Sequence, residues 1–415
     1  MKDIISDNGT NYKNRRISQK IKKLIDAFPV VVVSGARQVG KSTMLQHEFG
    51  DFDYVSLDDF DIMDRARLDP ATLWYNKDRI IIDEVQKYPP LLNTIKHAVD
   101  GSGRTKRFLL SGSSNLLLMK EVTESLAGRA LYIDLLPFTY GERQGIATPT
   151  NYDQLWDSEA VFQEAALPQV DALEYLLKGF MPPLLEVQDH VSVVAWLEGY
   201  VRTYLERDLR NLSQIDSLVD FRKVMRVLSL RIAQVLNQAD VAKDSGVSHT
   251  TTHRYLKLLE ISQIMHRVEA YAVNRTKRIV KSPKAFFMDP ALSILLAGYF
   301  DRPSLEKARE LGSFFESMVY LHLKALCELM TPKSTVYYWR TVSGAEVDFV
   351  VEHGHKLLAF EVKMTTSPSV NDIKNLLVFL KDYPETVRGV LVHAGSEVKM
   401  LHSKVIAMPW WWLDC

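Results

Sequence analysis

The stretch that decides the fold of the N-terminal part of this chain is Gly35-Ala36-Arg37-Gln38-Val39-Gly40-Lys41-Ser42. The β-branched run 29–34 leads into it and predicts a short, buried strand of a parallel sheet. Residues 42–47 follow as a predicted helix, so the stretch has the strand–loop–helix context of a phosphate-binding P-loop. Its glycines let backbone N–H groups point inward at phosphate. The stretch therefore predicts an α/β domain that binds a nucleotide.

The side chains around this loop predict ATP hydrolysis. We expect Lys41 to reach the β- and γ-phosphates and Ser42 to hold Mg²⁺. A second buried strand, 79–83, ends in Asp83, which suits Mg²⁺ through water. The next residue, Glu84, suits orienting or deprotonating the attacking water. The expected nucleotide contacts are Gly35, Arg37, Gln38, Val39, Gly40, Lys41, Ser42, Thr43 and Ser113, with Ser42 and Asp83 on the metal.

Two further positions are candidates for completing the site. A third strand, 107–111, is followed by Ser113 and Asn115. Either side chain could sense the γ-phosphate, with Ser113 favoured, or the two could cap a helix. Arg129 precedes the strand 130–134 and is expected to act as an arginine finger on a neighbouring subunit's nucleotide. The alternative for Arg129 is a surface arginine at a helix end.

The segments 35–42, 80–84, 109–115 and 124–130 resemble the AAA+ branch of P-loop ATPases. They are similar to a prokaryotic AAA family that carries a nuclease-like C-terminal domain. The resemblance implies a three-layer AAA+ ATPase core over 1–150 and a helical lid or linker over 151–220, with ATP and Mg²⁺ as cofactors. No convincing sensor-2 arginine follows Pro137. An arginine finger at Arg129 implies a homo-oligomer, for which a hexameric ring is one candidate arrangement.

A winged-helix domain is predicted over 221–300. The helix 236–246, a glycine turn and a helix 249–259 capped by Ser248 have the shape of a helix–turn–helix. Residues 272–278 are expected to form the basic tip of a β-wing. The expected exposed polar side chains of the second helix are His249, Thr250, Thr252, His253 and Arg254. They predict contact with branched or duplex DNA, although winged helices also bind proteins.

The C-terminal part carries a constellation of acids and a lysine. Residues 344–363 read as a β-hairpin in which Asp348, Glu361 and Lys363 share one face. Two carboxylates can bind a hard divalent cation, and the lysine can position water for phosphodiester attack. Glu316, on a predicted helix 312–322, could add a ligand.

This order of residues resembles the core pattern of the PD-(D/E)XK nuclease superfamily. The resemblance implies an α/β nuclease-like domain over 301–415, with Glu316, Asp348 and Glu361 as metal ligands. It implies catalytic roles for Asp348, Glu361 and Lys363. A nuclease fold that has lost cleavage is the alternative.

The composition of the chain limits which classes of protein it can belong to. The chain has 51 basic and 51 acidic residues, so any basic surface must be local. Its two cysteines, Cys327 and Cys415, form no metal or redox motif and fit a reducing, cytoplasmic setting. Residues 1–16 lack the apolar core of a signal peptide, and no apolar run is long enough to span a membrane.

Together these features predict an ATP-hydrolysing DNA motor or remodeller with a metal-dependent nuclease-like domain, for which branched or Holliday-junction DNA is a candidate substrate. The alternative is an ATP-dependent signalling or scaffold switch, for instance in phage defence or toxin control. In that alternative the nuclease-like domain binds without cutting.

Overall fold

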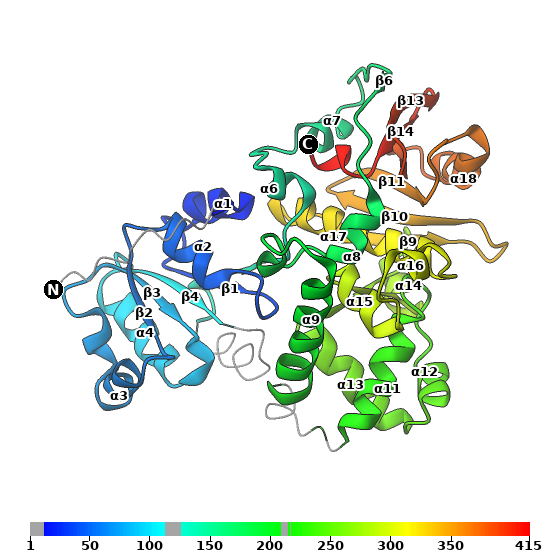
Figure 1. The fold of residues 1–415 in the computed structure, drawn as a ribbon. Coiled ribbons are helices and arrows are strands. Elements are labelled where there is room, and N and C mark those ends of the chain that lie inside the picture. Colours follow the sequence, from blue (N-terminus) through cyan, green and yellow to red (C-terminus); the bar gives the residue numbers. More distant parts are fainter. Residues whose placement is uncertain (1–11, 113–125, 209–214, 216) are drawn as a thin grey trace.

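A computed structural model describes residues 12–112, 126–208, 215 and 217–415 (Figure 1). The N-terminal sheet domain lies to one side, and the helical middle part and a second sheet lie to the other. The two expected γ-phosphate sensors, Ser113 and Asn115, fall outside the described residues. None of the helices in the described ranges is long and apolar enough to cross a membrane.

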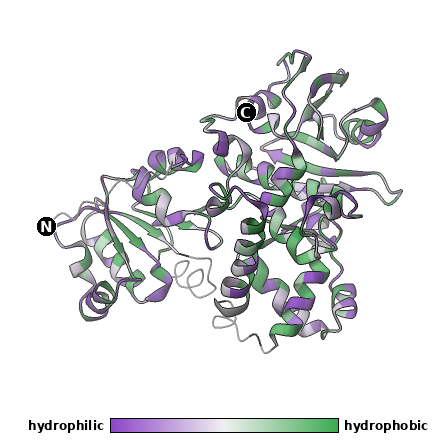
Figure 2. Cartoon of the chain, viewed as in Figure 1, coloured by the Kyte–Doolittle hydropathy of each residue, from purple (hydrophilic) through white to green (hydrophobic). Residues whose placement is uncertain are grey.

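The N-terminal sheet is entirely parallel, with the strand order β2-β3-β4-β1-β5. Four of its strands were predicted, and the edge strand β2 was missed because half of its residues are exposed. The central strands of this domain are apolar in sequence, and Figure 2 colours them as hydrophobic. The strands are β1 (Val30–Ser34), β2 (Asp53–Ser56), β3 (Arg79–Asp83), β4 (Arg107–Ser111) and β5 (Ala130–Asp134).

Successive side chains of β1 pack into two different cores, as the period of a strand requires. Val31 and Val33 share a core with helices α1 (Arg16–Leu24) and α2 (Lys41–Glu48). Val30 and Val32 share the other core with α3 (Phe60–Leu68) and α4 (Leu91–Gly101). Helices therefore cover both faces of the sheet, and the predicted three-layer core is confirmed.

The middle part is mainly helical and joins the core that contains Val31 and Val33. Helix α9 (His190–Tyr200) continues as a π-helix, η4 (Val201–Asp208). Other described elements of this part, up to the helix–turn–helix, are α6 (Tyr140–Gln144), α7 (Thr150–Leu155), β6 (Ala165–Ala166), α8 (Ala172–Lys178), η3 (Pro182–Leu184) and α11 (Leu218–Ser229).

The predicted helix–turn–helix is present as α12 (Gln238–Ser245) and α13 (His249–Ile261). Gly246 between them has φ +65°, and the Ser248 side chain accepts a hydrogen bond from the Thr251 N–H at 3.2 Å. One expected exposed residue was wrong, because Thr252 is fully buried. An antiparallel pair follows, β7 (Met265–Val268) and β8 (Lys284–Phe287).

The prediction of a basic β-wing tip at residues 272–278 was also wrong. The connection between β7 and β8 contains a helix, α14 (Arg275–Val280), instead of a strand tip. Arg278 is buried and binds Glu352 of the C-terminal sheet with two hydrogen bonds, of 2.7 and 3.1 Å. Because this arginine pairs inside the protein, it does not offer its charge to DNA.

The C-terminal sheet has seven strands, in the order β6-β13-β14-β12-β11-β10-β9. The predicted hairpin is confirmed as antiparallel β10 and β11. Strand β6 comes from residues 165–166, so this sheet recruits a segment from outside 301–415. Its strands are β9 (Thr335–Arg340), β10 (Glu346–His353), β11 (Lys356–Lys363), β12 (Thr386–His393), β13 (Glu397–His402) and β14 (Val405–Pro409).

Helices α17 (Leu311–Leu329) and α18 (Lys374–Asp382) cover opposite faces of this second sheet, since they belong to different cores. The core on the α17 side is continuous with the one that holds the inner face of β1. The final residues turn back as η6 (Trp412–Asp414), and Trp410 and Trp411 are buried. The three parts of the chain are therefore packed against one another.

Candidate active site

The P-loop of the structure has the tight backbone that phosphate binding needs. A Cβ on Gly35 would lie 2.4 Å from the Leu135 carbonyl oxygen, so only glycine fits there. Gln38 and Gly40 have φ of +69° and +88°, in the left-handed region. Lys41 is 7% exposed and donates hydrogen bonds to the carbonyls of Gly35 and Ala36, at 3.0 and 2.9 Å. Burial lowers the pKa of Lys41 to about 8.

The remaining predicted loop residues surround this lysine. Val39 is buried, whereas the side chains of Arg37 and Gln38 are exposed. Ser42 and Thr43 lie in the first turn of α2, whose free N–H groups and dipole favour an anion. These positions suit the nucleotide and Mg²⁺ contacts predicted for them.

Asp83, at the end of β3, is held by two hydroxyl donors that the sequence did not reveal. The Tyr54 hydroxyl of β2 donates to Asp83 Oδ2 at 2.7 Å, and the Ser111 hydroxyl of β4 donates to Oδ1. Both donors come from strands that flank β3. Ser111 ends β4 as Asp83 ends β3, and this was the signal available in the sequence, since ligands of parallel sheets gather at strand ends. Tyr54 lies two residues before the end of β2, the strand that was missed. Asp83 is thereby fixed for the expected water-mediated Mg²⁺ contact.

Glu84 directly follows and turns away from the strand, with φ +53°. Its carboxylate accepts a hydrogen bond from the Gln86 side-chain amide. Burial, and then the negative charge of Asp83, raise the pKa of Glu84. A carboxylate with a raised pKa is a stronger base, as a group that takes a proton from water must be.

A cavity of about 390 Å³ adjoins the P-loop at Gly40 and Thr43. Tyr12 stacks on His47 beside it, with ring centres 4.4 Å apart and planes 8° apart. Aromatic and apolar side chains at such a cavity suit a planar base. The other side chains that line it are Lys13, Arg15, Phe138, Pro182, Leu185, Glu186 and Gln188.

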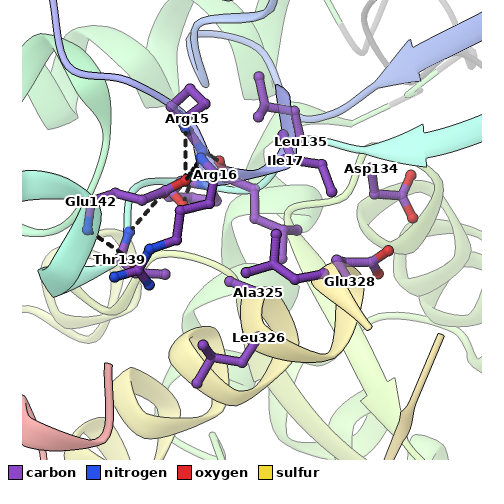
Figure 3. Close-up of a pocket in the computed structure, with 13 residues that line it drawn as sticks. Arg15, Arg16, Ile17, Asp134, Leu135, Thr139, Glu142, Ala325, Leu326 and Glu328 are labelled. Atoms are coloured by element: carbon purple, nitrogen blue, oxygen red, sulfur yellow. Dashed lines mark hydrogen bonds and ion pairs between the residues drawn. The ribbon is translucent and has the colours of Figure 1, made fainter. Parts of the chain in front are cut away.

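Side chains from outside the motif bind the carbonyls of the P-loop itself. Arg15 donates to the Val39 carbonyl at 3.1 Å. It also forms an ion pair with Glu142 at 3.4 Å (Figure 3). From the other side, the Tyr200 hydroxyl of α9 donates to the Arg37 carbonyl at 3.2 Å. The P-loop is therefore connected to the start of α1 and to the middle part.

Arg129 lies at the opposite end of the sheet from the P-loop of its own chain. The parallel register pairs Ala130 with Val30, where β1 begins, whereas the P-loop follows Ser34. Arg129 binds Asp100 through two hydrogen bonds, of 2.7 and 2.8 Å, and this pairing lowers the pKa of Asp100. At this end of the sheet Arg129 lies away from the P-loop of its own chain. The arginine finger stays a prediction, beside the alternative of a surface arginine.

The second predicted site also comes together. Asp348 Oδ2 accepts the Val362 N–H of β11 at 2.8 Å, which places it beside Glu361. Lys363 Nζ lies 2.7 Å from Glu361 Oε1. Burial raises the pKa of Glu316 and of Glu361 to about 8 each. Sequence reasoning therefore identified a true cluster of acids in the C-terminal part.

Sequence reasoning missed the cation at the centre of this cluster. Lys284 of β8 is 3% exposed, and its Nζ lies 3.0 Å from Glu316 Oε1 and 2.7 Å from Glu346 Oε1. Asp348 Oδ1 is 3.9 Å away. Across the described parts of the chain, no three His, Cys, Asp or Glu side chains are arranged to hold a metal ion. The expected ligands Glu316, Asp348 and Glu361 thus do not fit a metal as they stand, because lysines already bind them.

Comparison with known proteins agrees with the N-terminal fold. Residues 27–144 match the AAA domain family, and residues 169–302 and 311–413 match two domains of unknown function, DUF8612 and DUF4143. The Walker-type ATPase PABY2304 of Pyrococcus abyssi shares 16% identity with this chain, at a TM-score of 0.44. That match covers 68% of this chain and 95% of the other.

Two curated relatives span most of the chain. The uncharacterized proteins Rv2008c of Mycobacterium tuberculosis and Mb2031c of Mycobacterium bovis are each 30% identical to it over 400 residues. The alignments cover 96% of this chain and 83% of each relative. The chain therefore belongs to the family of these mycobacterial proteins, and its N-terminal part is a P-loop ATPase domain of the AAA type.

Proposed function

We propose that this protein hydrolyses Mg²⁺-ATP at the P-loop and uses Glu84 to activate water. The observation that carries the proposal is Asp83, fixed by Tyr54 and Ser111, next to Glu84 with its raised pKa. Lys41 would neutralise charge on the phosphates, while Ser42 and Asp83 would hold the metal. When bound, Mg²⁺ supplies electrostatic stabilisation of the charge on the transferring phosphoryl group.

The test is ATP turnover by Glu84→Gln, measured beside ATP affinity. The variant keeps the shape of the side chain but removes the base, so we expect turnover to fall by about 10²- to 10⁴-fold while binding persists. Glu159→Gln, at an exposed glutamate, is the control that should turn over ATP normally. Undiminished turnover in Glu84→Gln would rule out this role.

We also propose that Arg129 completes the site of a neighbouring subunit. Arg129→Ala should then reduce turnover strongly and leave nucleotide affinity near normal, because a finger acts on the transition state. Asp100→Ala removes the partner of Arg129 but keeps the arginine, so it should retain turnover. Equal losses in both variants would instead indicate that the pair only supports the fold.

DNA is the proposed object of the ATPase cycle. Supporting residues lie on the exposed face of α13, which includes His249, Thr250, His253 and Arg254. Such side chains on the second helix of a helix–turn–helix can meet phosphates and base edges, and the winged-helix reading of this region is part of the same proposal. ATP turnover with junction, duplex and single-stranded DNA tests it, and the absence of stimulation by all three would refute it.

A second candidate function is an ATP-dependent switch whose nuclease-like C-terminal domain binds without cutting. The observation that favours it is the ammonium of Lys284 between the acids that a nuclease would use for metal. Labelled DNA incubated with Mg²⁺ or Mn²⁺ should then stay intact, as it should with Asp348→Ala and Lys363→Ala. Cleavage by the wild type that both variants lose would establish the nuclease instead.

A further inference from the structure

The C-terminal acids receive their cation from another part of the chain. Glu316 comes from α17, and Glu346 and Asp348 come from β10, all within the DUF4143 segment. Lys284 comes from β8, in the DUF8612 segment. Its side chain passes the Tyr338 ring, 5.7 Å from the ring centre, and ends among the three carboxylates. The contact thus joins two segments that match separate families.

Each acid of the cluster already has a partner. The Lys284 ammonium has three N–H donors and faces three carboxylates, which meets the requirement of a buried positive charge for counter-charges. Glu361 is paired with Lys363, and the second oxygen of Asp348 accepts the Val362 N–H. The other oxygen of Glu361 is buried without a hydrogen-bond partner. The free oxygens of the cluster are thus few for a hard cation, which is held by carboxylate oxygens together with waters.

The segment that leads to Lys284 is attached to the C-terminal sheet at three points. Arg278 binds Glu352 through two hydrogen bonds. The Tyr338 hydroxyl donates to the Ser282 carbonyl at 2.6 Å, and the Tyr271 N–H donates to the Tyr338 carbonyl at 2.6 Å. Lys284 therefore cannot leave the acids unless this attached segment also moves.

We propose that the Lys284 ammonium is the resident cation of the carboxylate cluster and excludes divalent metal from it. The ammonium and a metal ion would compete for the same oxygens, and two cations this close repel each other strongly in a buried site. The cluster then serves as an ion-pair junction that fastens the middle part to the C-terminal sheet. This role of Lys284 is separate from the proposed ATPase activity. Because metal binding at the cluster is measured without nucleotide, the result does not depend on whether the protein hydrolyses ATP.

The experiment counts Mn²⁺ bound to the full chain by electron paramagnetic resonance, in a Ser42→Ala background that removes the P-loop metal ligand. The chain with Lys284 intact should bind no Mn²⁺ at the cluster. Lys284→Met should gain about one Mn²⁺ per chain, and adding Asp348→Asn should remove it. Lys281→Met is the matched control: this exposed lysine, three residues earlier, reaches only the Arg340 carbonyl and should gain nothing.

Two results would overturn the proposal. One is a Mn²⁺ ion bound by the chain with Lys284 intact and lost with Asp348→Asn or Glu361→Gln. The other is a folded Lys284→Met that binds no Mn²⁺, since the lysine would then not be what excludes metal. If Lys284→Met does not fold, Lys284→Gln replaces it, and the chain with Lys284 intact still decides the first result.

Discussion

Arg15 donates a hydrogen bond to the carbonyl oxygen of Val39, 24 positions further along the chain and inside the P-loop. The same guanidinium pairs with Glu142 and lies over the Phe138 ring, 4.1 Å from its centre. Arg15 is buried, so its position is set by these partners, of which Figure 3 shows Glu142. A change in the P-loop backbone on binding phosphate would therefore alter the contacts of Arg15. The arginine is in this sense a positioning residue for the loop.

Replacing Arg15 should weaken ATP binding more than it slows the bound complex. Arg15→Lys keeps the charge but loses the fork that reaches two partners at once, so the loop should be less ordered before ATP binds. We expect KM for ATP to rise roughly ten-fold, which is about 1.4 kcal/mol, with kcat changed far less. Asn14→Ala, at the exposed residue before it, is the control. A fall in kcat at constant KM would contradict this role.

The next residue, Arg16, connects the start of α1 to the end of the chain. It forms a buried ion pair with Asp414, whose other oxygen accepts the Gly141 N–H. Removing one partner of a buried pair leaves the other charge unpaired, so Asp414→Ala should lower the free energy of unfolding by about 3–5 kcal/mol. Denaturant unfolding of both single variants and the double variant measures the coupling. Additive losses would show that the pair contributes little.

The sequence predicted local features well and long-range ones poorly. The P-loop, the strand ending at Asp83 and the β10–β11 hairpin are encoded in short contiguous patterns, and the structure confirms their elements. Tyr54 and Ser111 lie 29 and 28 positions from Asp83, and Lys284 lies 32 positions from Glu316. Such contacts depend on how strands and segments pack, which a local pattern does not contain.

The basic wing tip was wrong for the same reason. The sequence places Arg275 and Arg278 between two apolar segments, a pattern that is typical of a solvated loop. Only the docked sheet supplies Glu352 and makes Arg278 an internal charge. The same docking brings Lys284 to the acids. The packing of this segment on the C-terminal sheet therefore explains both why the wing-tip prediction was wrong and why Lys284 was missed.

Acid should destabilise the protein partly through His322. This buried ring accepts the Tyr140 N–H at 2.9 Å and contacts the Met318 carbonyl at 2.8 Å, and burial lowers its pKa. A histidine with a lowered folded pKa binds protons more readily when unfolded, so its contribution is complete above about pH 6.5 and is lost as pH falls below that. The slope is about 1.4 kcal/mol per pH unit for one proton.

His322→Gln keeps an acceptor for Tyr140 but does not titrate. As the pH falls from 6.5 to 5, the free energy of unfolding of the variant should therefore fall less steeply than that of the wild type. The difference between the two slopes should approach the value for one proton. Denaturant unfolding at a series of pH values measures this difference. His355→Gln, at an exposed histidine in the turn between β10 and β11, is the control. Parallel curves for wild type and His322→Gln would refute the assignment.

ATP binding should be linked to proton uptake by Lys41. Without nucleotide the pKa of Lys41 is about 8, because the side chain is buried in the loop. At pH 8.5 a large share of the chains then carry neutral Lys41, and phosphate beside it raises the pKa and draws in a proton. Uptake should approach one proton at higher pH and vanish near pH 7. Calorimetric titrations in buffers of different ionisation enthalpy measure it. In Lys41→Arg the group stays charged at every pH used, so binding that remains should take up no proton through this residue, and an equal uptake there would place the titrating group elsewhere.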